Sequence, residues 1–411
     1  MKKILAVLAV IGPGLFLVGY NIGTGSITTM ASAGADYGMT LVWPLLISCI
    51  FTFVLLIAFG RYTAITGETA LFSFKRHFGV VPALFVLVSL LLSEFVSSIG
   101  VLAVVCESVQ EWSRPLTSSG EGFNTIVLAA VFIAILYALI LNGRYSFFEK
   151  ILAVFVGLMG LSFLATMFMV IPDVSEVIAG MVPSIPKQAN TALLIAGMVG
   201  TTMGGVLYVV RSILVKEKGW GRDDLRRERN DAFVSVAVMF LLSIAIMASA
   251  AGTLHPRGLH IESAIDMVRL LEPLAGRFAI SVFVAGIVAA GLSSLFPIIL
   301  LGPWLLADYN GTERDLKSTS SRIFMLGVVL LGLIVPIFGG RPVLVMIVSQ
   351  ALLTVATPLI ILLMLILQNR ESALDDDKAS TLMNVAMVVI FLFSLVMAGF
   401  GLVGVFDLVT G

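Results

Sequence analysis

Long apolar runs recur from one end of this chain to the other and constrain its fold more than any other feature. Runs near or above the roughly 20 residues that a helix needs to cross a bilayer follow one another along its 411 residues. Only 12% of the residues are charged, against about 25% in soluble domains, so the chain could not form a water-facing surface all round. Backbone groups in lipid must be satisfied internally, which helices do. The sequence therefore predicts an all-α polytopic membrane protein.

We expect one transmembrane domain over residues 1–411, with about eleven spans. Their expected limits are 4–34, 40–60, 80–110, 124–142, 147–172, 190–214, 232–253, 276–306, 322–339, 343–367 and 380–407. A first half over 1–172 and a second half over 190–367 would hold five spans each, and 380–407 would be an extra span. Because five is odd, the halves would have opposite orientations, as in an inverted repeat.

Basic residues gather in alternate loops, and this bias predicts the orientation. On one side lie Lys2, Lys3, Lys75, Arg76, Arg144, Lys150, the stretch 216–229, Arg314, Lys317 and Arg370. The opposite loops, 111–123, 173–188 and 255–275, are less basic. Loops rich in Lys and Arg stay in the cytoplasm, so we expect a cytoplasmic N-terminus and an outer C-terminus in a prokaryotic plasma membrane. The charged stretch 216–231 is expected to be a solvated connector.

The start of the chain has two interpretations. Met1-Lys2-Lys3, an apolar run and Ala31-Ser32-Ala33 together mimic a secretory signal peptide. We favour a retained first span, because the polar cluster from Asn21 to Gly25 has a use only if it stays.

Two apolar runs are interrupted by glycine at corresponding points of the expected halves. The first reads Gly19-Tyr20-Asn21-Ile22-Gly23-Thr24-Gly25, and the second reads Gly200-Thr201-Thr202-Met203-Gly204-Gly205. Broken helices leave backbone groups unpaired, which is tolerated at membrane depth only where they face protein or a wet cavity. A pair of breaks in equivalent positions indicates the substrate site of a transporter. Neither break contains a charged residue.

Short motifs follow one another along the expected spans. They are Gly12-Pro13-Gly14; Arg61 with Thr66-Gly67-Glu68; Gly143-Arg144-Tyr145 with Phe148-Glu149-Lys150; Met159-Gly160-Leu161-Ser162-Phe163; Val206-Leu207-Tyr208 with Ser212; and Ser349-Gln350 with Pro358. Over spans 1 to 10, this series resembles the Nramp metal-ion transporters. The resemblance implies a LeuT-type inverted repeat of five plus five helices with one extra C-terminal helix, helices 1 and 6 broken, and alternating access.

The chain departs from the family pattern at both breaks. Asn21 stands where the family has Asp, Ile22 where it has Pro, and Thr24 where it has Asn. In the sixth span the family's Met is kept at Met203, while glycines replace its Pro and His. The resemblance therefore implies a metal site whose carboxylate and histidine are missing.

On that basis, the expected substrate-binding residues are Asn21, Gly23, Thr24, Thr202, Met203, Gly204 and Gln350. Among them, Asn21, Thr24 and Met203 are the candidate metal ligands. Asn21 and Thr24 could instead cap loose backbone groups, Met203 could be a packing residue, and Gln350 could join helices by hydrogen bonds.

Glu94 lies near the middle of the third span, and an ionisable residue in hydrocarbon is by default functional. It matches an intramembrane Glu of the family's third span, but Val101 and Val104 replace the acids seven and ten residues later that help to carry protons in the family. We therefore expect the family's usual proton pathway to be absent. The alternative is a structural carboxyl bonded to Ser93, Ser97 or Ser98.

These features favour a secondary transporter that moves a divalent metal cation through a remodelled, uncharged site. A hard, partly hydrated ion such as Mg²⁺ suits a neutral site, whereas the Met203 sulfur suits transition metals. The alternatives are a LeuT-type transporter of a small organic solute and a non-transporting receptor.

Other functions are not supported. No P-loop or catalytic cluster is present, so neither an enzyme nor a cofactor is expected. Zero net charge argues against nucleic acid. The expected partners are the lipid bilayer and the transported ion or solute, and the oligomeric state is not predicted. Cys49 and Cys106 are expected to be packed thiols.

Overall fold

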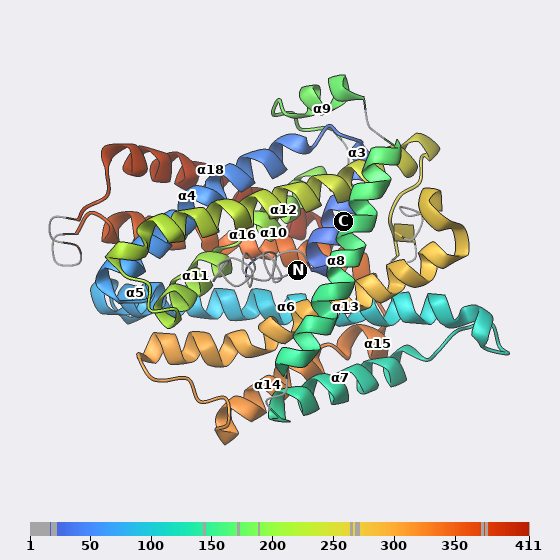
Figure 1. The fold of residues 1–411 in the computed structure, drawn as a ribbon, viewed down its shortest axis with the longest axis horizontal. Helices are drawn as coiled ribbons and strands as arrows, with labels where there is room; N and C mark the ends of the chain where they lie inside the picture. The colour runs from blue at the N-terminus through green and yellow to red at the C-terminus, as the bar shows by residue number, and fades with distance from the viewer. Residues whose placement is uncertain are drawn as a thin grey trace.

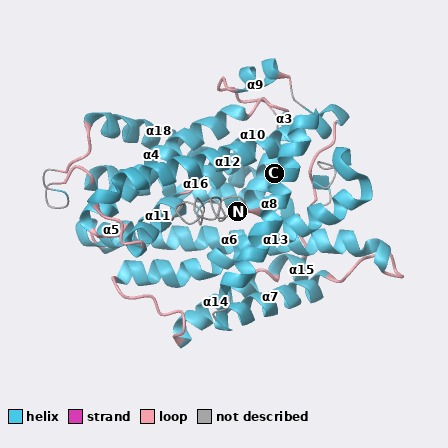
Figure 2. Ribbon diagram, in the orientation of Figure 1, coloured by secondary structure: helices cyan, strands magenta, loops and turns pink. Residues whose placement is uncertain are grey.

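The computed structural model describes residues 17, 23–142, 145–170, 173–187, 190–263, 266–267, 272–370, 374 and 377–410. This part of the chain consists of helices and loops, without a strand (Figure 2). Asn21, the motif Gly12-Pro13-Gly14 and Arg144 lie outside it.

The long helices follow the expected spans, and Figure 1 shows most of them running side by side along the molecule. In the first half they are α3 (Thr24–Tyr37), α4 (Val42–Thr66), α6 (Val80–Ser113), α7 (Thr125–Asn142) and α8 (Tyr145–Val170). In the second half they are α10 (Thr191–Met203), α11 (Gly205–Glu217), α12 (Leu225–Thr253), α13 (Glu272–Asn310), α14 (Thr319–Leu331), α15 (Ile334–Phe338) and α16 (Pro342–Leu367), followed by α18 (Thr381–Thr410).

Shorter elements lie between the spans. They are α5 (Ala70–Phe78), α9 (Val174–Gly180) and the 3₁₀ turns η1 (Arg114–Leu116), η2 (Arg222–Asp224) and η3 (His255–Arg257). Among the described residues, 8 helices are long and apolar enough to cross a membrane. Within the span expected at 322–339, a turn at Gly332 and Leu333 separates α14 from α15.

The sixth span is broken as predicted. Gly204 has extended backbone angles (φ −62°, ψ 137°) between α10 and α11. The backbone N–H of Gly205 donates instead to the Thr357 hydroxyl of α16 at 2.9 Å, and the Thr52 hydroxyl donates to the Thr202 carbonyl at 2.9 Å. Neighbouring helices thus satisfy groups that the break releases. The 18-residue core of this span is 100% buried, so the break lies at the centre of the bundle.

The loops that carry basic residues meet at one end of the bundle. Arg61 donates to the Asp377 carbonyl at 2.8 Å, and Lys75 donates to the Tyr309 carbonyl at 3.2 Å. Arg314 pairs with Glu217 at this end. These contacts join segments that the sequence places in alternate loops, as the expected alternation of spans requires.

The stretch 216–231 is not a solvated connector throughout, because α12 begins at Leu225 and one face of its first turns, with Glu228 and Asp231, is buried. Arg211 of α11 is fully buried, and it pairs with Glu228 at 2.8 Å and with Asp231. A buried guanidinium requires opposite charge and hydrogen-bond acceptors. Glu228 and Asp231 are therefore buried beside Arg211. This is a tertiary contact, which the number of charged residues along the stretch does not reveal.

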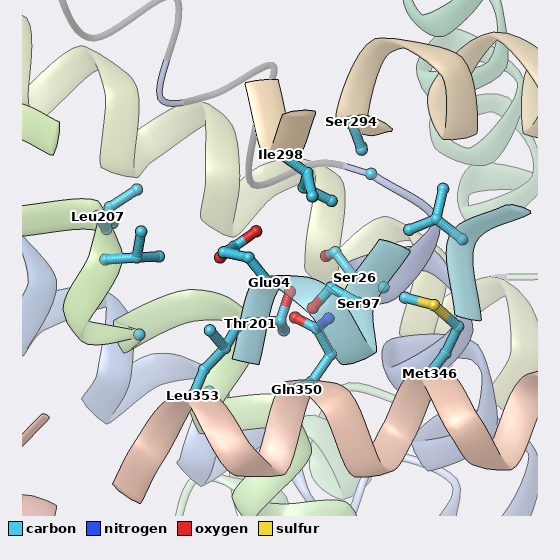
Figure 3. Close-up of a pocket in the computed structure, with 16 residues that line it drawn as sticks. Ser26, Glu94, Ser97, Thr201, Leu207, Ser294, Ile298, Met346, Gln350 and Leu353 are labelled. Carbon is cyan, nitrogen blue, oxygen red and sulfur yellow. The ribbon is translucent and has the colours of Figure 1, made fainter. Parts of the chain in front are cut away.

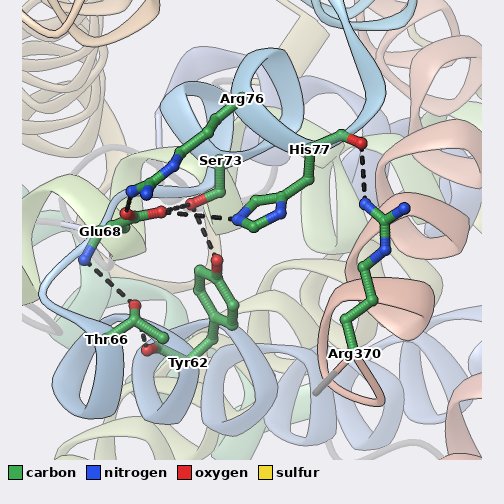
Figure 4. Close-up of polar contacts among 7 residues, drawn as sticks. All are labelled: Tyr62, Thr66, Glu68, Ser73, Arg76, His77 and Arg370. Carbon is green, nitrogen blue, oxygen red and sulfur yellow. Dashed lines mark hydrogen bonds and ion pairs between the residues drawn. The ribbon is translucent and has the colours of Figure 1, made fainter. Parts of the chain in front are cut away.

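A second polar cluster ties α4, α5 and α16 together at the basic end (Figure 4). Glu68 pairs with Arg76 and accepts a hydrogen bond from Ser73 at 3.0 Å. The Nε2 atom of His77 lies 3.9 Å from a Glu68 oxygen, and Arg370 donates to the His77 carbonyl at 2.8 Å. Burial lowers the pKa of the His77 imidazole below 6.5; Glu68 raises it, while Arg370 and Arg76 lower it further.

Candidate functional site

A small cavity of about 40 Å³ lies beside the break between α10 and α11. Figure 3 shows side chains of α6, α13 and α16 pointing into the same space as residues of the break. The lining residues come from six helices, α3, α6, α10, α11, α13 and α16, together with Gly23, which precedes α3, and Gly204, which lies at the break. They are Gly23, Gly25, Ser26, Glu94, Ser97, Val101, Gly200, Thr201, Gly204, Val206, Leu207, Ser294, Ile298, Met346, Gln350 and Leu353.

Glycines let the backbones and side chains around this cavity approach closely. A Cβ atom at Gly200 would lie 1.8 Å from the Gln350 carbonyl oxygen, so only glycine fits against α16. A Cβ atom at Gly25 would lie 2.6 Å from Nε2 of Gln350 and 3.1 Å from the terminal methyl of Met346. The glycines that marked the breaks in the sequence therefore also make room for α16, Gly200 for its backbone and Gly25 for two of its side chains.

Glu94 is the one ionisable side chain among the described lining residues, and it is 1% exposed. Its carboxyl group lies in the middle of the cavity view, opposite α16 (Figure 3). The described residues of the break at Gly204 and of its flanking helices contribute no ionisable side chain to the cavity, whereas α6 contributes the Glu94 carboxyl group.

The structure brings together four of the residues expected at the site: Gly23, Gly204, Gln350 and Glu94 all line the cavity. Asn21 lies outside the described residues. Thr24, Thr202 and Met203 are buried, but they are not among the lining residues.

Each of these three residues has a different setting. The Thr202 hydroxyl donates to the Met198 carbonyl at 2.8 Å. The Thr24 hydroxyl makes no hydrogen bond to any described residue. Met203 is 1% exposed in the hydrophobic core. The roles of Asn21, Thr24 and Met203 as metal ligands stay predictions.

The expected substrate-binding residues did not include Met346 or the hydroxyl residues Ser26, Ser97, Thr201 and Ser294, which also line the cavity. Met346 precedes Gln350 by four residues and therefore lies on the same face of its helix. That spacing was visible in the sequence. The serines gave no comparable signal, since hydroxyl residues are common in packed membrane helices.

The polar groups that line the cavity indicate whether it would bind a cation or an anion. A carboxyl group, an amide, a thioether and hydroxyls surround the cavity. The carbonyls at the C-terminal end of α10 lie beside it, where a helix carries partial negative charge. Such a set favours a cation over an anion.

Comparisons with known proteins agree with this arrangement. The family model described as "Natural resistance-associated macrophage protein-like", abbreviated Nramp, matches residues 14–404. A divalent metal cation transporter MntH of Caldanaerobacter subterraneus is 22% identical, over 97% of this chain and 93% of that protein. The MntH of Erwinia tasmaniensis is 24% identical, over 91% and 89%.

Solved structures show the same fold. A crystal structure of the Eremococcus coleocola manganese transporter, in complex with an aromatic bis-isothiourea compound, has a TM-score of 0.74 to this structure. The two chains are 13% identical, and the match covers 97% of this chain and 86% of the other.

Proposed function

The chain belongs to the Nramp family and has its LeuT-type fold, and from this premise we propose that it is a secondary transporter of a divalent metal cation working by alternating access. The observation that carries the proposal is the buried Glu94 carboxyl in a cavity at the helix break. The MntH relatives are divalent metal cation transporters by name, which supports the substrate class.

Electrostatics explains why Glu94 matters most. Taking a divalent cation out of water is costly, and neutral dipoles offset only part of that cost. A carboxylate in the cavity supplies the opposing charge that the family obtains from an aspartate at the first break. In this chain the charge would come from α6, while the break at Gly204 supplies carbonyl oxygens.

The size of the cavity favours an ion over an organic solute. One water needs about 10–15 Å³ of such space, so about 40 Å³ accommodates an ion with one or two waters. Pockets for drug-sized molecules measure about 300 Å³ or more. The organic-solute alternative has no specific observation in its favour.

Proton coupling by the family's usual route is not part of the proposal. Val101 lines the cavity and Val104 is fully buried, where the family has acids. All three histidines of the chain are described, and none lines the cavity. Glu94 therefore has no ionisable neighbour among the described lining residues to pass a proton to.

The ion would leave toward the basic end of the bundle, which we place in the cytoplasm together with the N-terminus. A second hollow of about 510 Å³ lies at that end, lined by Lys216, Trp304, Asp308 and others. The helices α11 and α13 line both spaces, so the cavity and the hollow lie along the same two helices.

Flux measurements test this proposal. The purified protein in liposomes should take up Mn²⁺, Mg²⁺ or Ca²⁺ above the level of empty vesicles. Absence of uptake of all three ions would overturn metal transport. Stabilisation by a small organic solute and by no metal, in a thermal screen of the same preparation, would favour the alternative.

A further inference from the structure

We propose that Arg226 and Arg229, on the first turns of α12, bind the headgroup phosphate of an anionic phospholipid in the cytoplasmic leaflet. This lipid site is separate from the cavity, so it can exist whether or not the protein transports a metal. The charged residues of one short segment divide between two faces of α12, and this division carries the proposal.

The acids of the segment 225–231 face the interior of the bundle. The segment begins α12 and contains three arginines and two acids. Both acids, Glu228 and Asp231, are buried and pair with Arg211 of α11. The three arginines of the segment are exposed instead. Because Arg211 occupies the acids on the inner side, the outer side of the same turns carries only the positive charges of the segment.

Two of the exposed arginines are available to a ligand. Neither Arg226 nor Arg229 forms an ion pair or a hydrogen bond with any residue that the structure describes. The third, Arg227, lies over the Trp220 ring, with its guanidinium carbon 5.3 Å from the ring centroid. Asp223 is the nearest exposed acid in the sequence, and the three arginines outnumber it. A planar guanidinium matches a phosphate group through two parallel hydrogen bonds, so these side chains suit a phosphate ligand.

The two arginines share a helix face with side chains that contact lipid. Phe233 is 62% exposed and Leu241 is 47% exposed, as expected of apolar residues on the outside of a membrane bundle. Arg229 precedes Phe233 by four residues and Arg226 precedes it by seven, which is one and two turns of helix. The face that contacts acyl chains therefore continues directly into the arginines.

The length of the apolar run places the arginines at the depth of the headgroups. The run from Phe233 to Thr253 contains no charged residue and is about 30 Å long, the thickness of the hydrocarbon core. On the same scale, Arg229 lies about 6 Å and Arg226 about 10 Å beyond Phe233. The headgroup layer extends roughly 5–8 Å beyond the hydrocarbon, so both long side chains can reach a phosphate in it.

The leaflet follows from the position of these turns. Figure 1 shows α12 running along the bundle, with its first turns at the end where α5 lies. This is the basic end, which we place in the cytoplasm. Anionic lipids give the cytoplasmic surface of a membrane a negative potential that attracts basic segments beside a span.

A bound lipid would also act on the broken span. Glu228 lies between Arg227 and Arg229 in the chain and pairs with Arg211 of α11 at 2.8 Å. A headgroup that holds the first turns of α12 in place would stabilise the segment that neutralises this buried guanidinium. We therefore expect an anionic lipid to stabilise the protein against heat.

Native mass spectrometry of the purified full-length protein in a non-ionic detergent tests the site. The protein is titrated with phosphatidylglycerol, which is anionic, and with phosphatidylcholine, which has no net charge. The wild type should bind phosphatidylglycerol at least about fivefold more tightly, because each basic residue near an anionic surface contributes about that factor. Arg226→Gln with Arg229→Gln should weaken phosphatidylglycerol binding at least about tenfold.

The matched control removes two positive charges elsewhere. Lys187 and Lys317 are also exposed, and neither lies on α12. Lys187→Gln with Lys317→Gln should bind phosphatidylglycerol within threefold of the wild type. An equal loss in both double variants would mean diffuse attraction to the net charge and would overturn the site on α12. A loss of less than threefold in the arginine variant would overturn it as well.

Two measurements on the wild type do not depend on how the variants fold. Equal affinity for phosphatidylglycerol and phosphatidylcholine would contradict an anionic-lipid site. Inorganic phosphate at millimolar concentration should not displace phosphatidylglycerol; displacement would identify a site for free phosphate and overturn the lipid assignment. Phosphatidylglycerol should also raise the thermal unfolding midpoint of the wild type more than phosphatidylcholine does, and an equal effect of the two lipids would contradict the proposal.

Discussion

At the scale of single residues, the buried charges decide most of what this chain can do. Arg211 is fully buried between Glu228 and Asp231, and Glu94 is 1% exposed in the cavity. The ion pairs of Arg211 hold α11 against α12. Glu94 faces the cavity in which the ion would bind. Arg211 lies on α11, which begins at the break, and Glu94 lines the cavity beside the break.

Removing the guanidinium should destabilise the protein strongly. Arg211→Met would leave two carboxyl groups buried beside each other, and breaking a buried pair costs about 3–5 kcal/mol. Arg222→Gln is the matched control, because Arg222 pairs with Asp377 at the surface and exposed pairs contribute at most about 1 kcal/mol. Thermal unfolding in detergent should show a large drop in midpoint for the first variant and little change for the second. Equal midpoints would contradict a structural role for the triad.

Close packing at the break gives a second residue-scale prediction. Gly200→Ala should reduce both stability and transport, because its Cβ would lie 1.8 Å from the Gln350 carbonyl oxygen. Gly157→Ala in α8 is the control, since that Cβ has nothing within 4 Å. There alanine should be neutral or stabilising by up to about 1 kcal/mol, its advantage in helix propensity. Similar losses in both variants would show that close approach to α16 is not the cause.

At the scale of helices, the sequence predicted where the helices begin and end better than which face of each helix meets the cavity. The break at Gly204 followed from its glycines, and the span limits followed from the length of the apolar runs. Met346 was not predicted, although its four-residue spacing from Gln350 places both on one face of α16. That this face meets the cavity depends on packing against α3 and α6. Glu94 was predicted to be functional from its position in hydrocarbon, but its place beside the break at Gly204 required the fold.

The short helix α5 carries a pH-dependent contribution to stability. Burial lowers the pKa of His77 below 6.5, so the unfolded chain binds a proton more readily than the folded one. Stability should therefore fall as the pH drops through 6.5. His77→Gln should flatten the fall in unfolding temperature between about pH 7 and pH 5. An unchanged pH profile would mean that His77 does not contribute to it.

At the scale of the whole molecule, the two ends of the bundle differ in charge. The basic loops meet where α5 lies, and the 3₁₀ turn η3 lies at the opposite end, where His260 pairs with Asp36 at 2.8 Å. The proposed orientation places the basic end in the cytoplasm.

Cysteine labelling tests that orientation. The native thiols Cys49 and Cys106 are buried, so their background reaction should be low. A membrane-impermeant maleimide added to intact cells should label Ser119→Cys and should not label Lys218→Cys, although both positions are exposed. Lysis should make the second position reactive. The reverse pattern would invert the orientation.

The central claim is that the carboxyl group of α6 replaces the charge missing from the first break, and Mn²⁺ flux into liposomes tests it most directly. Glu94→Gln keeps the shape of the side chain and removes the charge, so uptake should fall at least about tenfold, as expected when an interaction with a charged group is lost. Glu111→Gln, near the C-terminal end of the same helix and paired with Arg114, should transport like the wild type. Equal Mn²⁺ uptake by the wild type and Glu94→Gln would contradict the claim.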